Sequence, residues 1–376
     1  MLPESTIARP VGRRVIAFGM DRKTDPGAAE RAVVAATPLL QAAIADRVTP
    51  GAVLQVAGPS GPGAAVARGA VAYGGEAVTL ETRYDLASVT KVTACLPSLL
   101  RLVEADELRL SDRVDRFFPA AGWMQEPSLG AVTVEDLALH RSGLPAWRPV
   151  FASVAGHRAV LTNVLQSSLS EPHGKNLYSD LGVIVLTAII ERVSGTPLQE
   201  FLRRQVLKPL GMSSTGFGPL PAGADVAATE DDGLRGPLAG RVHDENADAM
   251  DGVSGHAGLF ATAADVTRYA QAWLRFDAPF AGEELMRHAI GDLSQGEGAR
   301  RGLLWRLAEE GWPLGSKASE RAFGHTGFTG TSVLVDPGHG LVVTLLTNRV
   351  HPRRGPADGI VSLRHALHDA VVEAFK

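Results

Sequence analysis

Hydrophobic residues recur at helical spacing near both ends of the chain. Residues 26–46 are rich in alanine and place Val33, Leu40 and Ile44 on one face, which predicts an amphipathic helix. Residues 357–375 show the same pattern, so we expect a second helix of this kind at the other end. Each must bury its apolar face against another layer.

Strand-like segments lie next to these two helices in the sequence. Residues 52–57 and 64–71, separated by a glycine- and proline-rich turn, predict a hairpin. Towards the other end, three strand-like runs follow one another, and residues 337–340 form a turn signal between the last two. These three runs are residues 302–307, 331–336 and 341–347.

Between these strands the chain has mostly helical patterns. They cover residues 90–104, 134–140, 159–169, 181–193, 198–206, 263–276 and 283–290. The simplest assembly is an α+β fold in which both chain ends build one antiparallel sheet flanked by helices. We expect residues 1–105 and 250–376 to form this subdomain, with residues 106–249 inserted as a mostly helical one.

Composition narrows the classes of function. The chain has 376 residues, 45% of them hydrophobic, and a net charge of −4 without a basic stripe, so nucleic acid is not an expected partner. A single cysteine, Cys95, excludes an internal disulfide framework and a cysteine-rich metal site. Neither a signal-peptide pattern nor a run of about 18 apolar residues is present, so we expect a cytoplasmic protein that does not span a membrane.

The first candidate for chemistry is Ser88-Val89-Thr90-Lys91. A serine needs a neighbouring base to become a nucleophile, and a lysine three residues later on a helix lies on the same face. A serine at a helix start also has a free backbone N–H that can face a developing oxyanion. The alternative is an ordinary helix-start serine beside a solvated lysine, but of the six lysines only Lys91 has a serine three places earlier.

Two further motifs carry polar groups near predicted elements. Tyr178-Ser179-Asp180 precedes an apolar helix, where a phenol beside an ammonium can act as base and acid, or where the motif simply caps the helix. His325-Thr326-Gly327 precedes a strand. Its small residues allow a substrate to lie along an edge strand, with the N–H of Phe328 as a second oxyanion donor; a glycine-rich turn is the alternative.

Taken together, the three motifs and their order resemble the serine β-lactamase and penicillin-binding-protein superfamily, including class C-type enzymes and family VIII carboxylesterases. The resemblance covers about residues 30–372 and extends to the segments 137–145 and 252–260. It implies that Ser88 is acylated, that Lys91 is a proton acceptor and electrostatic partner, and that Tyr178 is the general base and acid. It also implies an oxyanion hole formed by the backbone N–H groups of Ser88 and Phe328.

Two residues depart from the superfamily's pattern. Asp180 stands where many relatives have asparagine, and His325 stands where β-lactamases have the lysine that holds a substrate carboxylate. Both changes weaken the expected anchoring of an anionic substrate. We therefore expect an esterase or small-amide hydrolase, with Asp180, His325, Thr326, Gly327 and Trp147 near the substrate.

Other functions stay open. The closest alternative is a β-lactamase, a D,D-carboxypeptidase or a D-aminopeptidase, and a second one is a non-catalytic penicillin-binding sensor. No glycine-rich nucleotide loop follows a strand, and the histidines at 243 and 256 do not have zinc spacing, so we expect neither cofactor nor metal. The expected partner is a small ester, amide or lactam. The sequence does not indicate an oligomeric state.

Overall fold

The computed structural model describes residues 27–119, 129–296 and 298–376. Its centre is a six-stranded antiparallel sheet in the order β2-β1-β9-β8-β7-β6. The strands are β1 (Gly51–Ala57), β2 (Ala64–Gly69), β6 (Arg306–Leu307), β7 (Phe323–Thr326), β8 (Ser332–Asp336) and β9 (Leu341–Thr347). The two ends of the chain therefore meet in one sheet, as predicted, with β1 paired to β9.

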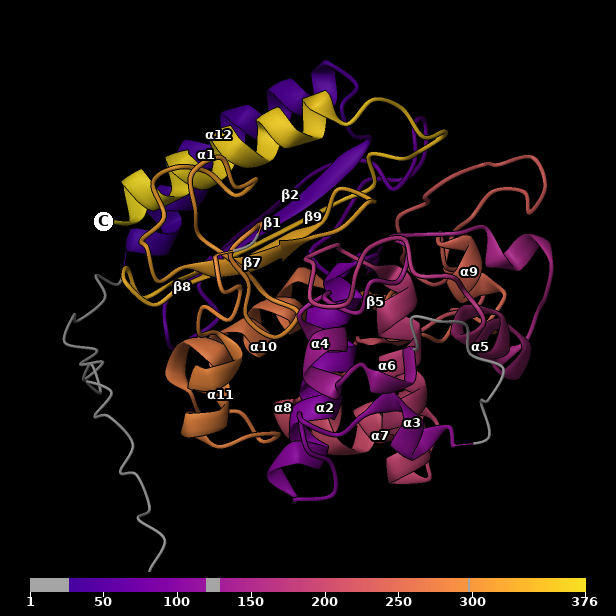
Figure 1. Ribbon diagram of the computed structural model, residues 1–376. Coiled ribbons are helices and arrows are strands. Elements are labelled where there is room, and N and C mark those ends of the chain that lie inside the picture. Colours follow the sequence, from indigo (N-terminus) through magenta and orange to yellow (C-terminus); the bar gives the residue numbers. More distant parts are fainter. Residues whose placement is uncertain (1–26, 120–128, 297) are drawn as a thin grey trace, which may run out of the picture.

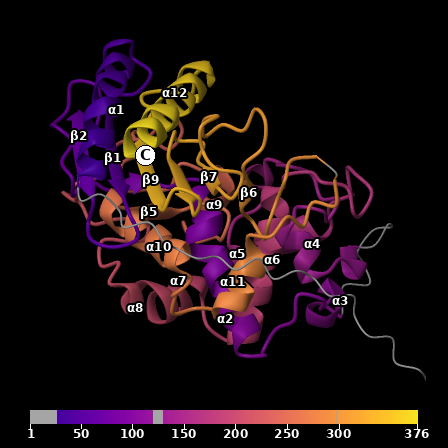
Figure 2. The same ribbon diagram turned by 90° about the vertical axis from the view of Figure 1, so that its left-hand side faces the viewer.

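Helices cover both faces of this sheet. On one face α1 (Ala28–Ala45) and α12 (Asp358–Phe375) lie side by side, seen in indigo and yellow in Figure 1 and again in Figure 2. On the other face α10 (Ala263–Arg275) packs against β1, β8 and β9. The predicted α+β fold is confirmed.

Side chains of the central strands alternate between two cores. Leu54 on β1 and Leu345 on β9 are paired in register and pack in the cluster under α1 and α12, whereas Val53 and Leu346 join the larger cluster on the other face. Because both faces are covered, these strands read as continuous apolar runs rather than as alternating ones.

The helices of the middle segment lie beside the sheet (Figure 1). They include α2 (Leu96–Glu104), α3 (Val114–Phe117), α4 (Val134–Ala138), α5 (His157–Leu165), α6 (Asp180–Ser194), α7 (Leu198–Leu202), α8 (Lys208–Leu210), α9 (Glu245–Asp248) and α11 (Glu283–Ala289). Among them α6 is central and contacts α2, α3, α4, α5 and α7. A small second sheet orders β3 (Tyr84–Asp85), β5 (Leu259–Ala261) and β4 (Gly216–Phe217). The subdomain boundaries at residues 105 and 250 stay a prediction.

Some predicted elements differ in detail. The helix expected over residues 90–104 begins with a π-helical turn, Lys91–Cys95, before α2. The strand expected over 302–307 is reduced to β6, because Leu304 has a left-handed backbone with φ 56°. Residues 1–26, part of the first predicted subdomain, lie outside the described residues.

None of the described helices is by itself long and apolar enough to cross a bilayer. One pair, α6 with the stretch Leu198–Leu210, passes a test of length and composition together, but the two are bent by 70° to each other.

The packing of the central strands predicts the effect of a core substitution. Leu345→Ala removes a fully buried side chain, so the free energy of unfolding should fall by about 2–5 kcal/mol. Val34 on α1 is 71% exposed, and Val34→Ala should change that free energy by no more than about 0.5 kcal/mol. Urea denaturation measures both, and equal effects would contradict the packing described here.

Candidate active site

Ser88 lies in a tight turn between β3 and the π-helical turn. The preceding residue, Ala87, has φ 46°, a left-handed conformation that is costly for a residue with a Cβ. Hydrogen bonds hold this turn: Asp85 Oδ1 accepts the Ala87 N–H at 2.8 Å, and Thr331 Oγ1 donates to Leu86 O at 2.9 Å. The strained turn is thus fixed from β3 itself and from the segment beside β8.

Lys91 is fully buried, and its ammonium group has three partners. The Nζ atom donates to Ser88 Oγ at 2.9 Å and to His256 O at 3.0 Å, and it lies 2.7 Å from Asp180 Oδ1. Burial alone would lower the pKa of Lys91, but the charge of Asp180 and hydrogen bonding with Asp180 and Tyr178 outweigh it and raise that pKa above its ordinary value. Lys91 is therefore an ammonium ion at neutral pH.

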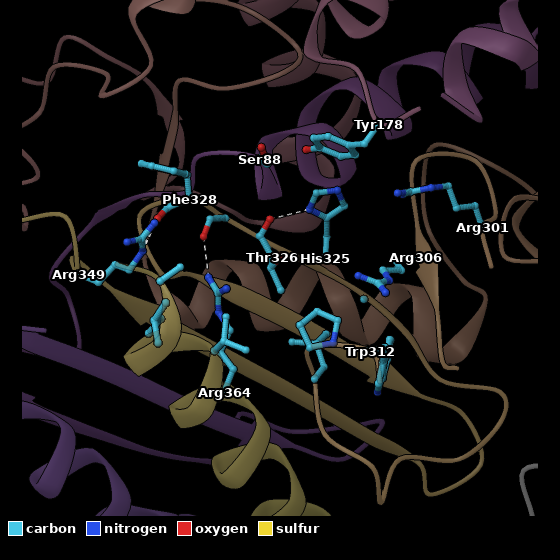
Figure 3. A pocket seen from close by; sticks show the side chains of 17 residues that line it. Ser88, Tyr178, Arg301, Arg306, Trp312, His325, Thr326, Phe328, Arg349 and Arg364 are labelled. Atoms are coloured by element: carbon cyan, nitrogen blue, oxygen red, sulfur yellow. Dashed lines mark hydrogen bonds between the residues drawn. The ribbon is translucent and has the colours of Figure 1, made fainter. Parts of the chain in front are cut away.

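The Tyr178 phenol points towards Ser88 (Figure 3), although the two residues are 90 positions apart. Lys91 Nζ lies 5.0 Å from the centre of its ring, and the Arg301 guanidinium lies 5.5 Å from it. Burial raises the pKa of Tyr178, while Lys91 and hydrogen bonding with Lys91 and Ser88 act in the opposite direction. The hydroxyl, the ammonium and the phenol thus meet in one cleft.

His140 contacts Tyr178 and both of its neighbours in the chain. Its carbonyl oxygen accepts the N–H of Leu177 at 2.9 Å, and its Nδ1 accepts the N–H of Ser179 at 3.1 Å. Its ring contacts the Tyr178 ring at a tilt of 39°, with 4.6 Å between centroids. Ser179 in turn caps α6, because its Oγ accepts the Gly182 N–H at 3.1 Å. Capping and placement of the phenol are therefore both served by this motif.

The third motif occupies the end of β7. His325 is buried, and its Nδ1 donates to Thr326 O at 2.9 Å. Burial, followed by the charge of Lys91, lowers the pKa of His325 to about 3, so the ring is neutral at pH 7. β7 is not the outermost strand as expected, but β6 pairs only with Phe323 and Gly324, which leaves His325 and Thr326 open to the cleft.

No hydrogen bond from the backbone N–H of Ser88 or of Phe328 to another group is found within the described ranges. Both residues line the same cavity (Figure 3). An unpartnered N–H pair beside a candidate nucleophile can stabilise an oxyanion. Gly327, between β7 and Phe328, must be a glycine here, because a Cβ would lie 2.2 Å from Thr331 Oγ1 and 2.5 Å from Leu86 O.

Cavities open on both sides of Ser88. One, of about 470 Å³, is lined by four arginines together with His325. The arginines are Arg301, Arg306, Arg349 and Arg364. The other cavity, of about 360 Å³, is lined by Trp147, Phe328, Asp180 and the segment 243–245. The candidate substrate residues therefore divide between two walls of one cleft.

The arginines are the functional candidates that the sequence analysis missed. Only Arg306 has a carboxylate partner in the described chain, Glu309 at 2.9 Å. Arg301 is 8% exposed. Among the described residues, its guanidinium makes a single hydrogen bond, from Nε to Asn176 Oδ1 at 3.3 Å. The signal available was the pair at 300–301, but nothing in that spacing indicated that Arg301 would reach the cleft.

The histidines considered as metal ligands are paired instead. His243 Nε2 lies 2.8 Å from Glu230 Oε2, and His256 Nε2 lies 2.8 Å from Asp244 Oδ1. Ser254 Oγ lies 2.7 Å from the other ring nitrogen of His256. Over the residues described, no group of three or more His, Cys, Asp or Glu side chains is arranged to hold a metal. This network supports the His256 carbonyl that accepts from Lys91.

Comparison with known proteins agrees with this geometry. The sequence model of the Beta-lactamase family matches residues 13–367. A putative D-alanyl-D-alanine carboxypeptidase of Escherichia coli K12 is 31% identical over 74% of this chain and 73% of its own. An N-acetylmuramyl-L-alanine amidase of Bacillus subtilis is 33% identical over 72% and 68%.

Solved structures share the fold. EstCE1, a hydrolase with promiscuous acyltransferase activity, superposes with a TM-score of 0.73 at 23% identity and covers 92% of this chain and 99% of its own. A class C β-lactamase from Rhodobacter sphaeroides has a TM-score of 0.69 at 21% identity over 90% and 99%. The family match covers nearly the whole length of the chain. The chain therefore belongs to the β-lactamase family and is a serine hydrolase of that family.

Proposed function

We propose that Ser88 is the nucleophile and that the protein hydrolyses esters or small amides through an acyl-enzyme. The observation that carries this proposal is the convergence of Ser88 Oγ, Lys91 Nζ and the Tyr178 phenol in one cleft, with 2.9 Å between the first two atoms. Neither capping nor packing requires these three groups to meet. Water then releases the acyl group, and no step requires a cofactor.

Tyr178 is the proposed proton carrier. Lys91 has its proton held by Asp180, so the lysine acts as a fixed positive charge rather than as the resting base. In the reactive form Tyr178 is a phenolate that has released its proton to solvent, and the Lys91 charge stabilises it. This phenolate accepts the Ser88 proton as Ser88 Oγ attacks the carbonyl, and so becomes a phenol. The phenol then returns the proton to the leaving group. The backbone N–H groups of Ser88 and Phe328 receive the oxyanion.

We assign the acyl group of the substrate to the cavity lined by Trp147 and Phe328, and this cavity favours neutral substrates. Trp147 is 44% exposed and Phe328 is 48% exposed, so both offer apolar surface to an acyl chain. The negative charge expected from Asp180 is compensated by Lys91 and does not stand alone against that chain. Neutral His325 offers no ionic anchor in the position where β-lactamases have lysine. These features support the esterase-like activity.

The arginine-lined cavity favours a second candidate, hydrolysis of an amide whose leaving group has a carboxylate. Arg301 directs a buried guanidinium towards Tyr178 and His325 (Figure 3), without a carboxylate partner in the described chain. A buried charge without a counter-ion is costly, and an anionic ligand removes that cost. A carboxypeptidase-like activity would use this charge in place of the missing lysine.

Substitution of the three groups tests the catalytic assignment. Ser88→Ala should abolish ester hydrolysis and labelling by a fluorophosphonate, and Lys91→Ala and Tyr178→Phe should each lower kcat by about a thousandfold or more. Ser98→Ala and Tyr73→Phe are matched controls that should retain activity, and thermal melting confirms folding. Intact mass spectrometry locates the label. Substantial activity in Ser88→Ala would overturn the proposal.

A comparison of substrates tests the preference. We expect p-nitrophenyl butyrate to be hydrolysed faster than nitrocefin, because a neutral acyl ester does not need the absent lysine. Far faster turnover of nitrocefin would contradict the esterase proposal and favour a β-lactamase. A penicilloyl adduct that persists, with no turnover of either substrate, would favour the penicillin-binding sensor.

Arg301 separates the two candidate functions. Arg301→Ala should lower hydrolysis of an N-acyl-D-Ala-D-Ala peptide at least about tenfold more than that of p-nitrophenyl butyrate, since one charge-assisted hydrogen bond contributes about 1.5–3 kcal/mol. Arg301→Lys should recover part of the difference, and the exposed Arg158→Ala should change neither rate. Equal losses for both substrates, measured as kcat/KM, would remove the carboxylate role.

A further inference from the structure

Arg364 reaches from the C-terminal helix α12 into the wall of the cleft. It is 6% exposed, and its Nη2 donates to Gly327 O at 2.6 Å and to Thr331 O at 2.8 Å. Its Nε donates to Gly330 O at 3.2 Å. Figure 3 shows this guanidinium below Thr326 and Phe328, with a dashed line to the carbonyl it binds. No carboxylate of the described residues forms an ion pair with it.

The contact of Arg364 with Gly327 O also affects the orientation of the Phe328 N–H. Gly327 O and the Phe328 N–H belong to the same planar, trans peptide unit, so they point in opposite directions. The Arg364 guanidinium holds this oxygen on the α12 side, together with the Gly330 N–H at 3.0 Å, so the Phe328 N–H is turned away from α12. Arg349 supports the next peptide in the same way, because its Nε donates to Phe328 O at 2.8 Å.

The charge of Arg364 acts on the same peptide. A cation that hydrogen-bonds a carbonyl polarises the amide and strengthens its N–H as a donor. Burial, followed by the neighbouring charge of Arg349, lowers the pKa of Arg364 to about 9, which leaves it charged at neutral pH. A buried cation without a counter-ion destabilises the fold. A developing oxyanion on the other side of this peptide would be stabilised by that charge.

We propose that Arg364 is a positioning residue for the oxyanion hole: by holding Gly327 O it orients and polarises the Phe328 N–H. This inference rests on the proposed function, in which that N–H receives the oxyanion of the Ser88 adduct. Arg364 touches neither substrate nor nucleophile, so it acts through the peptide unit. The competing explanation is a purely structural one, in which Arg364 ties α12 to the turn at 327–331.

A pair of substrates distinguishes these explanations. p-Nitrophenyl butyrate and its thionoester differ only in the atom that enters the oxyanion hole, and sulfur accepts a weaker hydrogen bond than oxygen. The quantity to measure is the ratio of kcat/KM for the oxygen ester to that for the thionoester. Loss of one oxyanion donor typically lowers kcat by about 10²–10³-fold. A structural defect lowers both rates alike and leaves the ratio unchanged.

We expect Arg364→Met to lower kcat for the oxygen ester by about a hundredfold with little change in KM. The thionoester should lose less, so the ratio should fall at least about tenfold. Arg364→Lys keeps the charge but cannot bind Gly327 O and Thr331 O with the same geometry, and should give an intermediate ratio. It also carries the test if the methionine variant does not fold. The matched control is Leu367→Ala, which removes a buried side chain from the same helix and should lower the melting temperature without changing the ratio.

The outcomes separate this inference from the catalytic assignment. An unchanged ratio in the folded Arg364 variants, or an equal change in Leu367→Ala, would overturn the positioning role while the nucleophile stands. Ester hydrolysis that persists in Ser88→Ala would instead overturn the proposed function. A ratio that falls with Arg364→Met, recovers partly with lysine and is unaffected in the control would support the inference.

Discussion

A fully buried ammonium ion has to be compensated by its surroundings, and at Lys91 this requirement organises the cleft. Removal of a charge from water costs several kcal/mol after relaxation, unless hydrogen bonds and an opposite charge replace the lost hydration. Lys91 meets the need with Ser88 Oγ, Asp180 Oδ1 and His256 O, which come from three distant parts of the chain. The segments that carry Asp180 and His256 are thereby brought to Ser88. The same contacts that neutralise the charge also assemble the site.

The supporting structure around this charge is a network of polar groups, in which His140 Nε2 is one of the few buried atoms without a hydrogen-bond partner among the described residues. His140 holds the backbone on both sides of Tyr178, while Asp244 and Ser254 bind the ring of His256, whose carbonyl meets Lys91. Strain is located at the same place, in the left-handed Ala87 before Ser88. Such conformations persist only where the surroundings over-determine them. The hydrogen bonds from Asp85 and Thr331 provide that constraint.

Charge is distributed unevenly around Ser88. The ring of His325 is neutral, so the third motif does not itself supply a cation, yet the wall beyond it carries arginines without carboxylate partners in the described chain. Arg301 directs its charge towards Tyr178, whereas Arg364 and Arg349 bind the carbonyls of two successive peptides, at Gly327 and Phe328. In the proposed function the charge of Arg301 is available to a leaving group, and the charges of Arg364 and Arg349 lie beside the transition state.

The sequence by itself determined the α+β class, the strands at 52–57 and 341–347, and the three motifs of the cleft. These follow from local rules: apolar periodicity, turn residues and the reach of a lysine three positions after a serine. Only the tertiary structure decided the partners of Lys91, the contacts of His140 around Tyr178, and the position of Arg301 and Arg364 in the wall of the cleft. The physical reason is that a long, charged side chain can end in water, in an ion pair or on a carbonyl. Which of these it does depends on neighbours that lie far away in the sequence, 37 positions for Arg364 and Gly327 and 165 for Lys91 and His256, and local periodicity does not report on them.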